Sequence, residues 1–196
     1  MTLELWNTVA STGTVVVITA TAIAALIQMR HARASNQIAA LAELGKAHDS
    51  PEFTAAYLFA STGLATKLKD PEFRYQVFEP KARTSENQTL MAQLALIGNH
   101  FETLGTLAMT GLIDRKVALM LWDGPALAAW DLLGPFLAIE RRRVADLWLH
   151  FEYFVVMAQD WREKHPDGVY PPKLRHIVVD DPWLVDDRRY AESRRA

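Results

Sequence analysis

The chain has 196 residues, half of them hydrophobic, and a formal net charge of −2 at pH 7. Its near-neutral charge, with no basic run longer than Arg141–Arg143, excludes the electrostatic footprint of a nucleic-acid-binding protein. Because cysteine is absent, disulfides, cysteine nucleophiles and thiolate metal sites are excluded as well.

The segment Leu5–Met29 carries no charged side chain, and its length of about 25 residues exceeds the roughly 20 that a helix needs to cross a bilayer core. We predict a transmembrane anchor here, with Trp6 at one interface and Arg30 and Arg33 just beyond the other. A cleaved signal peptide is one alternative, but its basic leader is missing and Glu4 stands in that place. A buried helix of a soluble protein is the other alternative, and such a helix would normally have a polar face.

The flanks of this segment predict its orientation. Arg30 and Arg33 follow the span, and no lysine or arginine precedes it. By the positive-inside rule, the N-terminus lies outside the cell membrane and the C-terminal domain is cytoplasmic. We therefore divide the chain into an anchor with its basic flank (residues 1–33), a helical domain (34–166) and an extended tail (167–196).

Small residues recur along one face of the predicted anchor. This stripe consists of Ala10, Gly13, Val17, Ala20 and Ala24. Such stripes let two helices approach closely in lipid, so we hypothesise a homo-oligomer formed through the anchor. The alternative is that any helix rich in alanine and threonine shows a stripe of this kind.

Beyond the span, the helical pattern continues to about Lys46 and is broken at Gly45 and the residues that follow it. The sequences Ser50-Pro51-Glu52 and Asp70-Pro71-Glu72 each predict a helix start, with an N-cap, a proline in the first turn and an acid near the positive end of the helix dipole. We expect the first of these helices to end near Lys69.

The longest soluble helix is predicted from Glu86 to Thr110. Ser85 and Gln88 suggest a capping box at its start, and Gly111 suits the left-handed residue that follows a helix. Asp114 then caps a short helix.

A break is expected at Asp123-Gly124-Pro125, followed by a helix from Ala126 that kinks at Pro135. The last strong helix runs from Val144 to Lys164, and the tail is expected to fray after Asp186. The predicted fold class is all-α: one N-terminal transmembrane helix, a cytoplasmic helical bundle and an irregular C-terminal tail.

Two His-Phe-Glu triplets are the strongest candidates for chemistry. They place His100 two residues before Glu102, and His150 two residues before Glu152. Residues two apart on a helix point about 200° away from each other, and the di-iron motif requires Glu and His three apart, so we predict no metal site. We predict instead a structural polar cluster in which Arg142 pairs with one of the two glutamates and bridges helices.

An ordered series of short motifs resembles bacterial proteins grouped as domain of unknown function 4760. The series comprises Phe101-Glu102-x-x-Gly105-x-Leu107, Gly111-Leu112-Ile113-Asp114, Trp130 with Leu133 and Pro135, Arg142, and Phe151-Glu152-Tyr153-Phe154. The resemblance extends to about Lys164. It implies a membrane-anchored helical domain, and it assigns no activity and no catalytic residue.

We therefore predict a single-pass membrane protein whose helical domain is an interaction or regulatory module, working with a protein partner or with itself. The alternative is an enzyme with an unrecognised acid/base or metal site around the two His-Phe-Glu triplets. A third possibility is an accessory factor of a phage or mobile-element defence system. Phosphate-binding loops and hydrolase motifs are absent, so we expect no cofactor and no nucleic-acid partner, and the catalytic residues stay unassigned.

Overall fold

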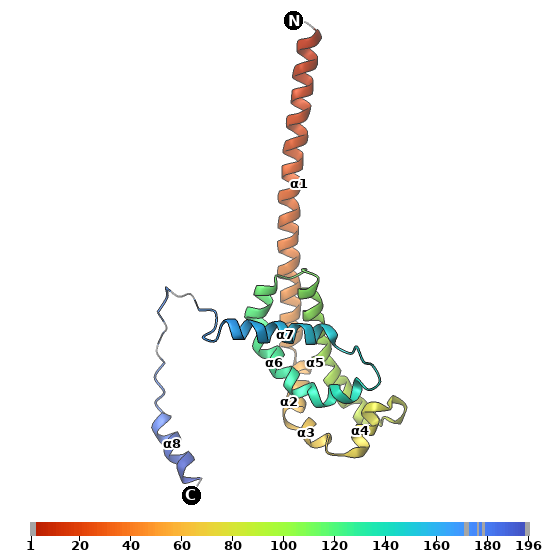
Figure 1. Ribbon diagram of the computed structural model, residues 1–196, viewed down its shortest axis with the longest axis vertical. Coiled ribbons are helices and arrows are strands. Elements are labelled where there is room, and N and C mark those ends of the chain that lie inside the picture. The colour runs from red at the N-terminus through yellow and green to blue at the C-terminus, as the bar shows by residue number, and fades with distance from the viewer. Residues whose placement is uncertain (1–2, 171–172, 176, 178, 195–196) are drawn as a thin grey trace. The chain divides into compact units, whose positions relative to one another are not determined.

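The computed structural model describes residues 3–170, 173–175, 177 and 179–194, with side chains from residue 12 onward. The chain forms two compact units, Met1–Lys164 and His165–Ala196. Each unit contains helix, and no strand occurs among the described residues, which confirms the all-α fold class (Figure 1).

Helix α1 (Leu3–His48) is one continuous helix that begins as the predicted anchor and ends inside the bundle. Gly45 does not break it, because the helix is held there by burial of Leu44 against the bundle core, with Ala40 and Leu41 packed beside it. The side chains of Trp6 and Ala10 lie outside the described residues.

The N-terminal half of α1 is exposed along its whole described length. Its large apolar side chains from Val15 to Met29 are all solvent-facing, and the helix is long and apolar enough to cross a membrane. Two hydroxyl groups bond back to the preceding turn: Thr19 Oγ1 donates to the Val15 carbonyl and Thr21 Oγ1 to the Val17 carbonyl, both at 2.8 Å. Each bond satisfies the hydroxyl group of its threonine within the helix.

The two predicted Pro-Glu helix starts are confirmed at α2 (Pro51–Thr62) and α4 (Pro71–Phe78). Ser50 Oγ accepts from the Phe53 N–H (3.1 Å), and Asp70 Oδ1 accepts from the Glu72 N–H (2.9 Å). The first helix is shorter than predicted, because it stops before Gly63 and a separate turn, α3 (Leu64–Lys67), follows.

Helix α5 (Ser85–Met109) follows the short 3₁₀ helix η1 (Pro80–Ala82). Its N-cap is Thr84 rather than the predicted Ser85, since Thr84 Oγ1 accepts from the Asn87 N–H (3.3 Å) and Ser85 is already helical. At the other end, Gly111 has a φ of +72°, which confirms the left-handed residue.

Helix α6 (Arg115–Glu140) begins at the predicted Asp114 cap and passes through both Pro125 and Pro135. The break predicted at Asp123-Gly124-Pro125 is therefore wrong. Buried side chains on both sides of Pro125, Trp122 and Ala126 among them, hold the two halves against one core, and this packing overrides the local break signal.

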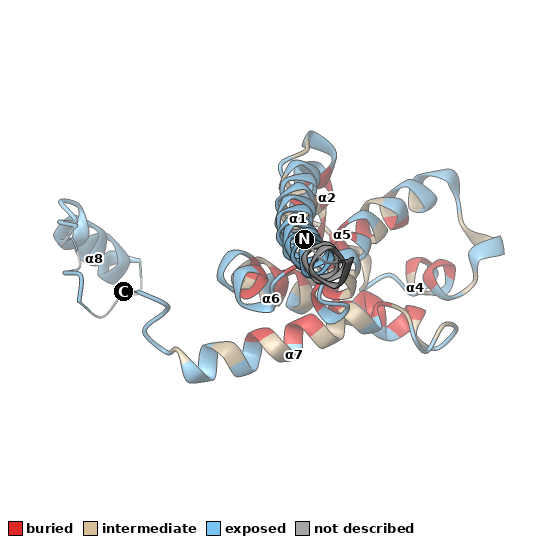
Figure 2. Ribbon diagram, turned by 90° about the horizontal axis from the view of Figure 1, so that it is seen from above, coloured by how far each residue is buried: buried red, intermediate tan, exposed pale blue. Residues whose placement is uncertain are grey.

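Helix α7 (Leu149–Lys164) starts five residues later than predicted, because residues 144–148 form turns and Trp148 has a φ of +57°. Helix α5 lies at the centre of the bundle and contacts α1, α2, α6 and α7. The rings of Phe101 on α5 and Phe151 on α7 stack with centroids 5.0 Å apart. Buried residues follow the inward faces of these helices (Figure 2).

The described residues of the C-terminal unit include one helix, α8 (Leu184–Ser193), where the sequence predicted fraying after Asp186. Asp186 and Asp187 lie in its first turn, where negative charge stabilises the helix dipole. No residue of α8 is buried.

Candidate functional site

The predicted polar cluster divides into separate sites in the bundle. Glu102 and His150 meet at the α5–α7 interface, whereas Glu152 pairs with an arginine nearby. The His100 ring instead packs against the rings of Phe53, Phe101 and Trp122. Because His100 and Glu102 are two apart on one helix, their side chains point in different directions, as the spacing predicts.

Glu102 holds the first turn of α7. Its Oε2 accepts from the Phe151 N–H (2.8 Å), and its Oε1 lies 3.2 Å from Nδ1 of His150. Phe151 is the third residue of α7, so its N–H has no acceptor within the helix, and the carboxylate of another helix takes the place of an N-cap side chain.

Thr106 completes this site and indicates the tautomer of His150. Thr106 Oγ1 donates to the Glu102 carbonyl (2.8 Å) and lies 2.8 Å from Nδ1 of His150. Since the hydroxyl proton is directed to that carbonyl, we infer that His150 carries its proton on Nδ1 and donates towards Thr106 and the Glu102 carboxylate. These contacts of Glu102, Thr106 and His150 join α5 to the start of α7.

The arginine that bridges helices is Arg141, and the predicted role of Arg142 is wrong. Arg141 Nη1 lies 2.6 Å from Glu152 Oε2, and its Nε and Nη2 donate to the Leu147 carbonyl at 3.0 and 2.8 Å. Arg142 is exposed and makes no ion pair with a described residue. Arg141 is the C-cap of α6 and faces the start of α7, whereas the next residue of the turn points to solvent.

A buried carboxylate, Glu140, was not predicted. It is only 5% exposed and lies between Arg83, whose Nη2 is 2.8 Å from its Oε1, and Arg143. Arg83 also donates to the carbonyls of Gln76 (3.0 Å) and Val77 (2.9 Å), so it joins α4 to the end of α6. The sequence signal was the acid that directly precedes the Arg141–Arg143 run.

An aromatic cluster at the junction of α1, α2, α5 and α6 contains two histidines. His48 and His100 have ring centroids 5.5 Å apart, and each lies close to Trp122, at 4.8 and 5.3 Å. Phe53 closes the cluster at 4.6 Å from His48 and 5.1 Å from His100. Sequence reasoning missed His48 because nothing local links the end of α1 to α5.

Three nitrogens in this cluster have no hydrogen-bond partner among the described residues. They are Nδ1 of His48, Nε2 of His100 and Nε1 of Trp122, all shielded from solvent. Burial lowers the pKa of the His100 imidazole to about 4, with a smaller contribution from the neighbouring His48. His100 is therefore neutral at pH 7, and a neutral imidazole surrounded by rings favours packing over proton transfer.

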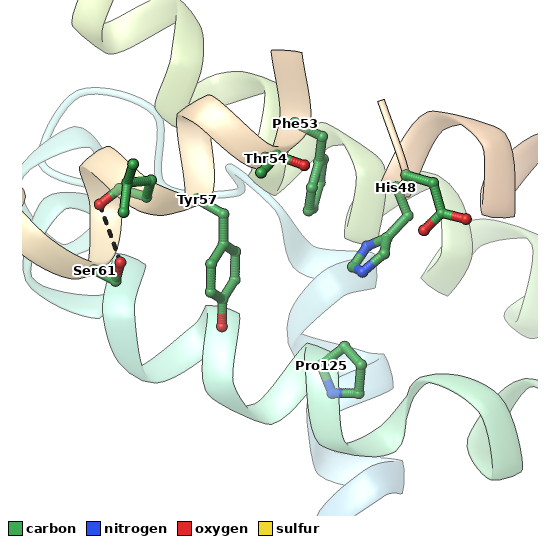
Figure 3. Close-up of a pocket in the computed structure, with 8 residues that line it drawn as sticks. His48, Phe53, Thr54, Tyr57, Ser61 and Pro125 are labelled. Atoms are coloured by element: carbon green, nitrogen blue, oxygen red, sulfur yellow. Dashed lines mark hydrogen bonds between the residues drawn. The ribbon is translucent and has the colours of Figure 1, made fainter. Parts of the chain in front are cut away.

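A pocket of about 600 Å³ opens beside the cluster, where His48 and Phe53 form part of its wall. Tyr57 of α2 and Pro125 of α6 lie across the same space (Figure 3). A second pocket, of about 410 Å³, lies between α1 and α5, with His100, Leu44 and Leu96 in its lining. Neither pocket is lined by Glu102, His150 or Glu152.

Within the described part of the chain, no group of three or more histidine, aspartate and glutamate residues is placed to hold a metal ion. The Glu102–His150 pair is committed to the start of α7, and Glu152 is committed to Arg141. The acid and base side chains that share a pocket wall are instead His48 with Asp49 in the first pocket and His100 with Glu43 in the second.

Comparison with known proteins agrees with this architecture. The family model described as "Domain of unknown function (DUF4760)" matches residues 15–161, from the apolar half of α1 to the end of the bundle. Searches of curated proteins and of solved structures each found no match. The resemblance that the short motifs indicated is confirmed, and the chain belongs to the DUF4760 family.

Proposed function

We propose that the protein is a single-pass membrane protein whose helical bundle binds a protein partner at the membrane surface. The membrane anchor is supported by the exposure of α1: the most apolar stretch of this helix has none of its residues buried by the rest of the chain. Burying one large aliphatic side chain gains about 1.5–3 kcal/mol, so an uncovered row of them favours lipid as its surroundings.

The N-terminus lies outside and the bundle inside the cell in this proposal. Arg30 and Arg33 follow the apolar stretch directly, and Glu4 is the one charged side chain before Arg30 in the sequence. The positive-inside rule places such a flank in the cytoplasm.

Partner binding is supported by an apolar stripe on the exposed face of α6. Val117, Met120 and Leu121 are spaced i, i+3 and i+4 on one face and are 36%, 52% and 57% exposed. Exposed apolar side chains at helical spacing are the pattern by which one helix recognises another. For the enzyme alternative, three of its candidate residues, Glu102, His150 and Glu152, bond across the bundle and line neither bundle pocket, so they do not converge with His100 on one site.

Photo-crosslinking in native membranes tests this function. A photoreactive amino acid at Val117 should give an adduct of one defined mass: twice the chain mass for a second copy, another mass for a different protein. The substitution Leu121→Asp should abolish the adduct without changing helical content by circular dichroism.

The matched control places the same photoreactive residue at Val156, a 50% exposed apolar position on α7. No adduct of defined mass should form there. If Val117 gives no adduct, or gives the same products as Val156, partner binding through α6 is wrong.

A further inference from the structure

A third pocket lies where α1 leaves the bundle. It has a volume of about 550 Å³ and is formed by one face of α1 and by Leu112, which lies between α5 and α6. Leu26, Met29, Arg30, Arg33 and Asn36 supply the α1 side.

The α1 side of this pocket changes character along the helix. Leu26, Met29, Arg33 and Asn36 recur at steps of three and four residues and so share one face. At about 1.5 Å per residue, the face passes from apolar to cationic to amide side chains within roughly 15 Å. A phospholipid offers the same order of chemistry: acyl chain, phosphate and polar headgroup.

The charges around the pocket are positive and unpaired. Arg30 and Arg33 make no ion pair with a described residue, and α1 has no aspartate or glutamate between Glu4 and Glu43. Outside the pocket lining, α6 begins with Arg115, which donates to the carbonyls of Ala108 (3.2 Å) and Met109 (3.4 Å), and with the exposed Lys116.

The carboxylate closest to Leu112 in the sequence is Asp114, which is engaged as the N-cap of α6 through the Val117 N–H (3.0 Å). It compensates only part of the positive charge.

Leu112 forms the apolar tip of the bundle at this level. It is 60% exposed although the adjacent Ile113 is buried, and the left-handed Gly111 turns the chain so that Leu112 faces outward. The Leu112 N–H donates to the Leu107 carbonyl (3.0 Å), which fixes the turn. An exposed leucine beside Leu26 and Met29 extends the apolar surface of α1 onto the bundle.

We propose that this pocket binds an anionic phospholipid: Arg30 and Arg33 bind the phosphate, and Leu26, Met29 and Leu112 contact the upper part of an acyl chain. The bound lipid fixes the α5–α6 end of the bundle against the bilayer surface. This binding site rests on the proposed function, because the pocket reaches the headgroup level only if α1 spans the membrane.

The test is lipid binding to the full-length protein, measured by native mass spectrometry in detergent with added phosphatidylglycerol or phosphatidylcholine. We expect phosphatidylglycerol to be retained at least tenfold more strongly. Each cation near an anionic lipid contributes about 1 kcal/mol, so Arg30→Gln with Arg33→Gln should weaken phosphatidylglycerol binding roughly 30-fold. Leu112→Ser should weaken both lipids alike.

Arg188→Gln with Arg189→Gln is the matched control, because it removes the same charge from the C-terminal unit. This variant should bind phosphatidylglycerol as the unchanged protein does. An equal loss in both double variants, or equal binding of the two lipids by the unchanged protein, overturns the site. Displacement of phosphatidylglycerol by millimolar inorganic phosphate also overturns it, since the pocket would then be a site for free phosphate.

Carbonate extraction of membranes that contain the protein distinguishes a failure of the lipid-site proposal from a failure of the membrane-anchor proposal. If the unchanged protein resists extraction but shows no lipid preference, the pocket proposal alone is wrong. If carbonate releases the protein, the membrane anchor itself is wrong, and the lipid site falls with it.

Discussion

At the scale of single residues, Glu102 shows how a side chain that resembles part of a catalytic pair serves the fold. Its carboxylate accepts from the Phe151 N–H and lies 3.2 Å from the His150 ring, so it caps a helix to which it does not belong. A cap of this kind contributes about 0.5–2 kcal/mol to stability.

Glu102→Ala should therefore lower the free energy of unfolding by about 1–2 kcal/mol, because the Phe151 N–H loses its acceptor at a helix interface. Glu102→Gln should retain most of this, since the amide oxygen still accepts. Urea unfolding of the full-length protein in detergent measures both. The control, Glu152→Ala, removes a partly exposed partner of Arg141 and should cost less than 1 kcal/mol. A smaller loss in Glu102→Ala than in Glu152→Ala would contradict the capping role.

The lowered pKa of His100 predicts that the stability of the fold depends on pH. Its pKa in the folded chain is about 4, against about 6.5 when unfolded, so the unfolded state binds its proton first as the pH falls. Stability present above pH 6.5 should be lost between pH 6.5 and 4, at up to about 1.4 kcal/mol for each pH unit from this group.

His100→Phe keeps a ring in the aromatic cluster and removes the titrating group. Its unfolding free energy should fall less steeply over that pH range than that of the unchanged protein. Chemical unfolding at a series of pH values checks this, and parallel curves for the two proteins would refute it.

The sequence predicts the residue types of these sites better than their partners. Two glutamates beside apolar stripes indicated a polar cluster with an arginine, and Glu152 does pair with Arg141, whereas Glu102 pairs with His150 at a separate site. Choosing Arg141 over Arg142 depends on where α6 ends and how the 144–148 turns run, and Glu140 depends on Arg83, which is distant in the chain. These are tertiary contacts with no local signal.

At the scale of elements, α5 and α7 approach closely because glycines leave room. A Cβ at Gly105 would lie 1.9 Å from the His150 carbonyl oxygen, and one at Gly98 would lie 2.0 Å from the Trp148 ring. The Glu102 cap and the stacked Phe101 and Phe151 rings depend on this short distance.

Gly105→Ala should therefore destabilise the bundle by about 3 kcal/mol or more, because the clash is with backbone that cannot move away cheaply. Gly45→Ala is the control: a Cβ there meets nothing within 4 Å, and alanine favours a helix by about 1 kcal/mol. Thermal unfolding should show opposite shifts in the two variants. A stable Gly105→Ala protein would mean that the α5–α7 packing is looser than described.

The small-residue stripe of α1 also belongs to this scale. A Cβ at Gly13 meets nothing within 4 Å in the single chain, so Gly13→Leu has no steric cost within one molecule. If two anchors associate through Gly13, Val17, Ala20 and Ala24, this substitution should reduce self-association several-fold in a membrane reporter assay of the span. An unchanged signal would exclude this face.

Local signals predicted the element boundaries where one residue's chemistry decides them. Ser50, Asp70 and Asp114 act as caps, and Gly111 takes a left-handed conformation, as their types indicate. The continuity of α6 through Pro125 was not predictable in this way, because burial on both sides of the proline decides it. The late start of α7 likewise depends on Trp148, whose ring is buried and whose Nε1 donates to Asn99 Oδ1 (3.0 Å).

At the scale of the whole molecule, the account depends on α1 serving two environments. The end of the helix is part of the bundle core through Leu44, while its apolar beginning has no protein cover. In the proposed arrangement, this continuous helix holds the bundle at a fixed position relative to the membrane without a flexible linker. The proposed lipid site depends on that attachment.

Cysteine accessibility tests this claim most directly, because the chain has no cysteine of its own. Val17 and Ile38 lie on the same helix and are almost equally exposed in the protein, at 64% and 67%. We predict that Val17→Cys is protected from a water-soluble maleimide while Ile38→Cys is labelled rapidly, in membrane fragments that are open to the reagent on both faces. Equal labelling of the two positions would contradict the account, because α1 would then be surrounded by water along its whole length.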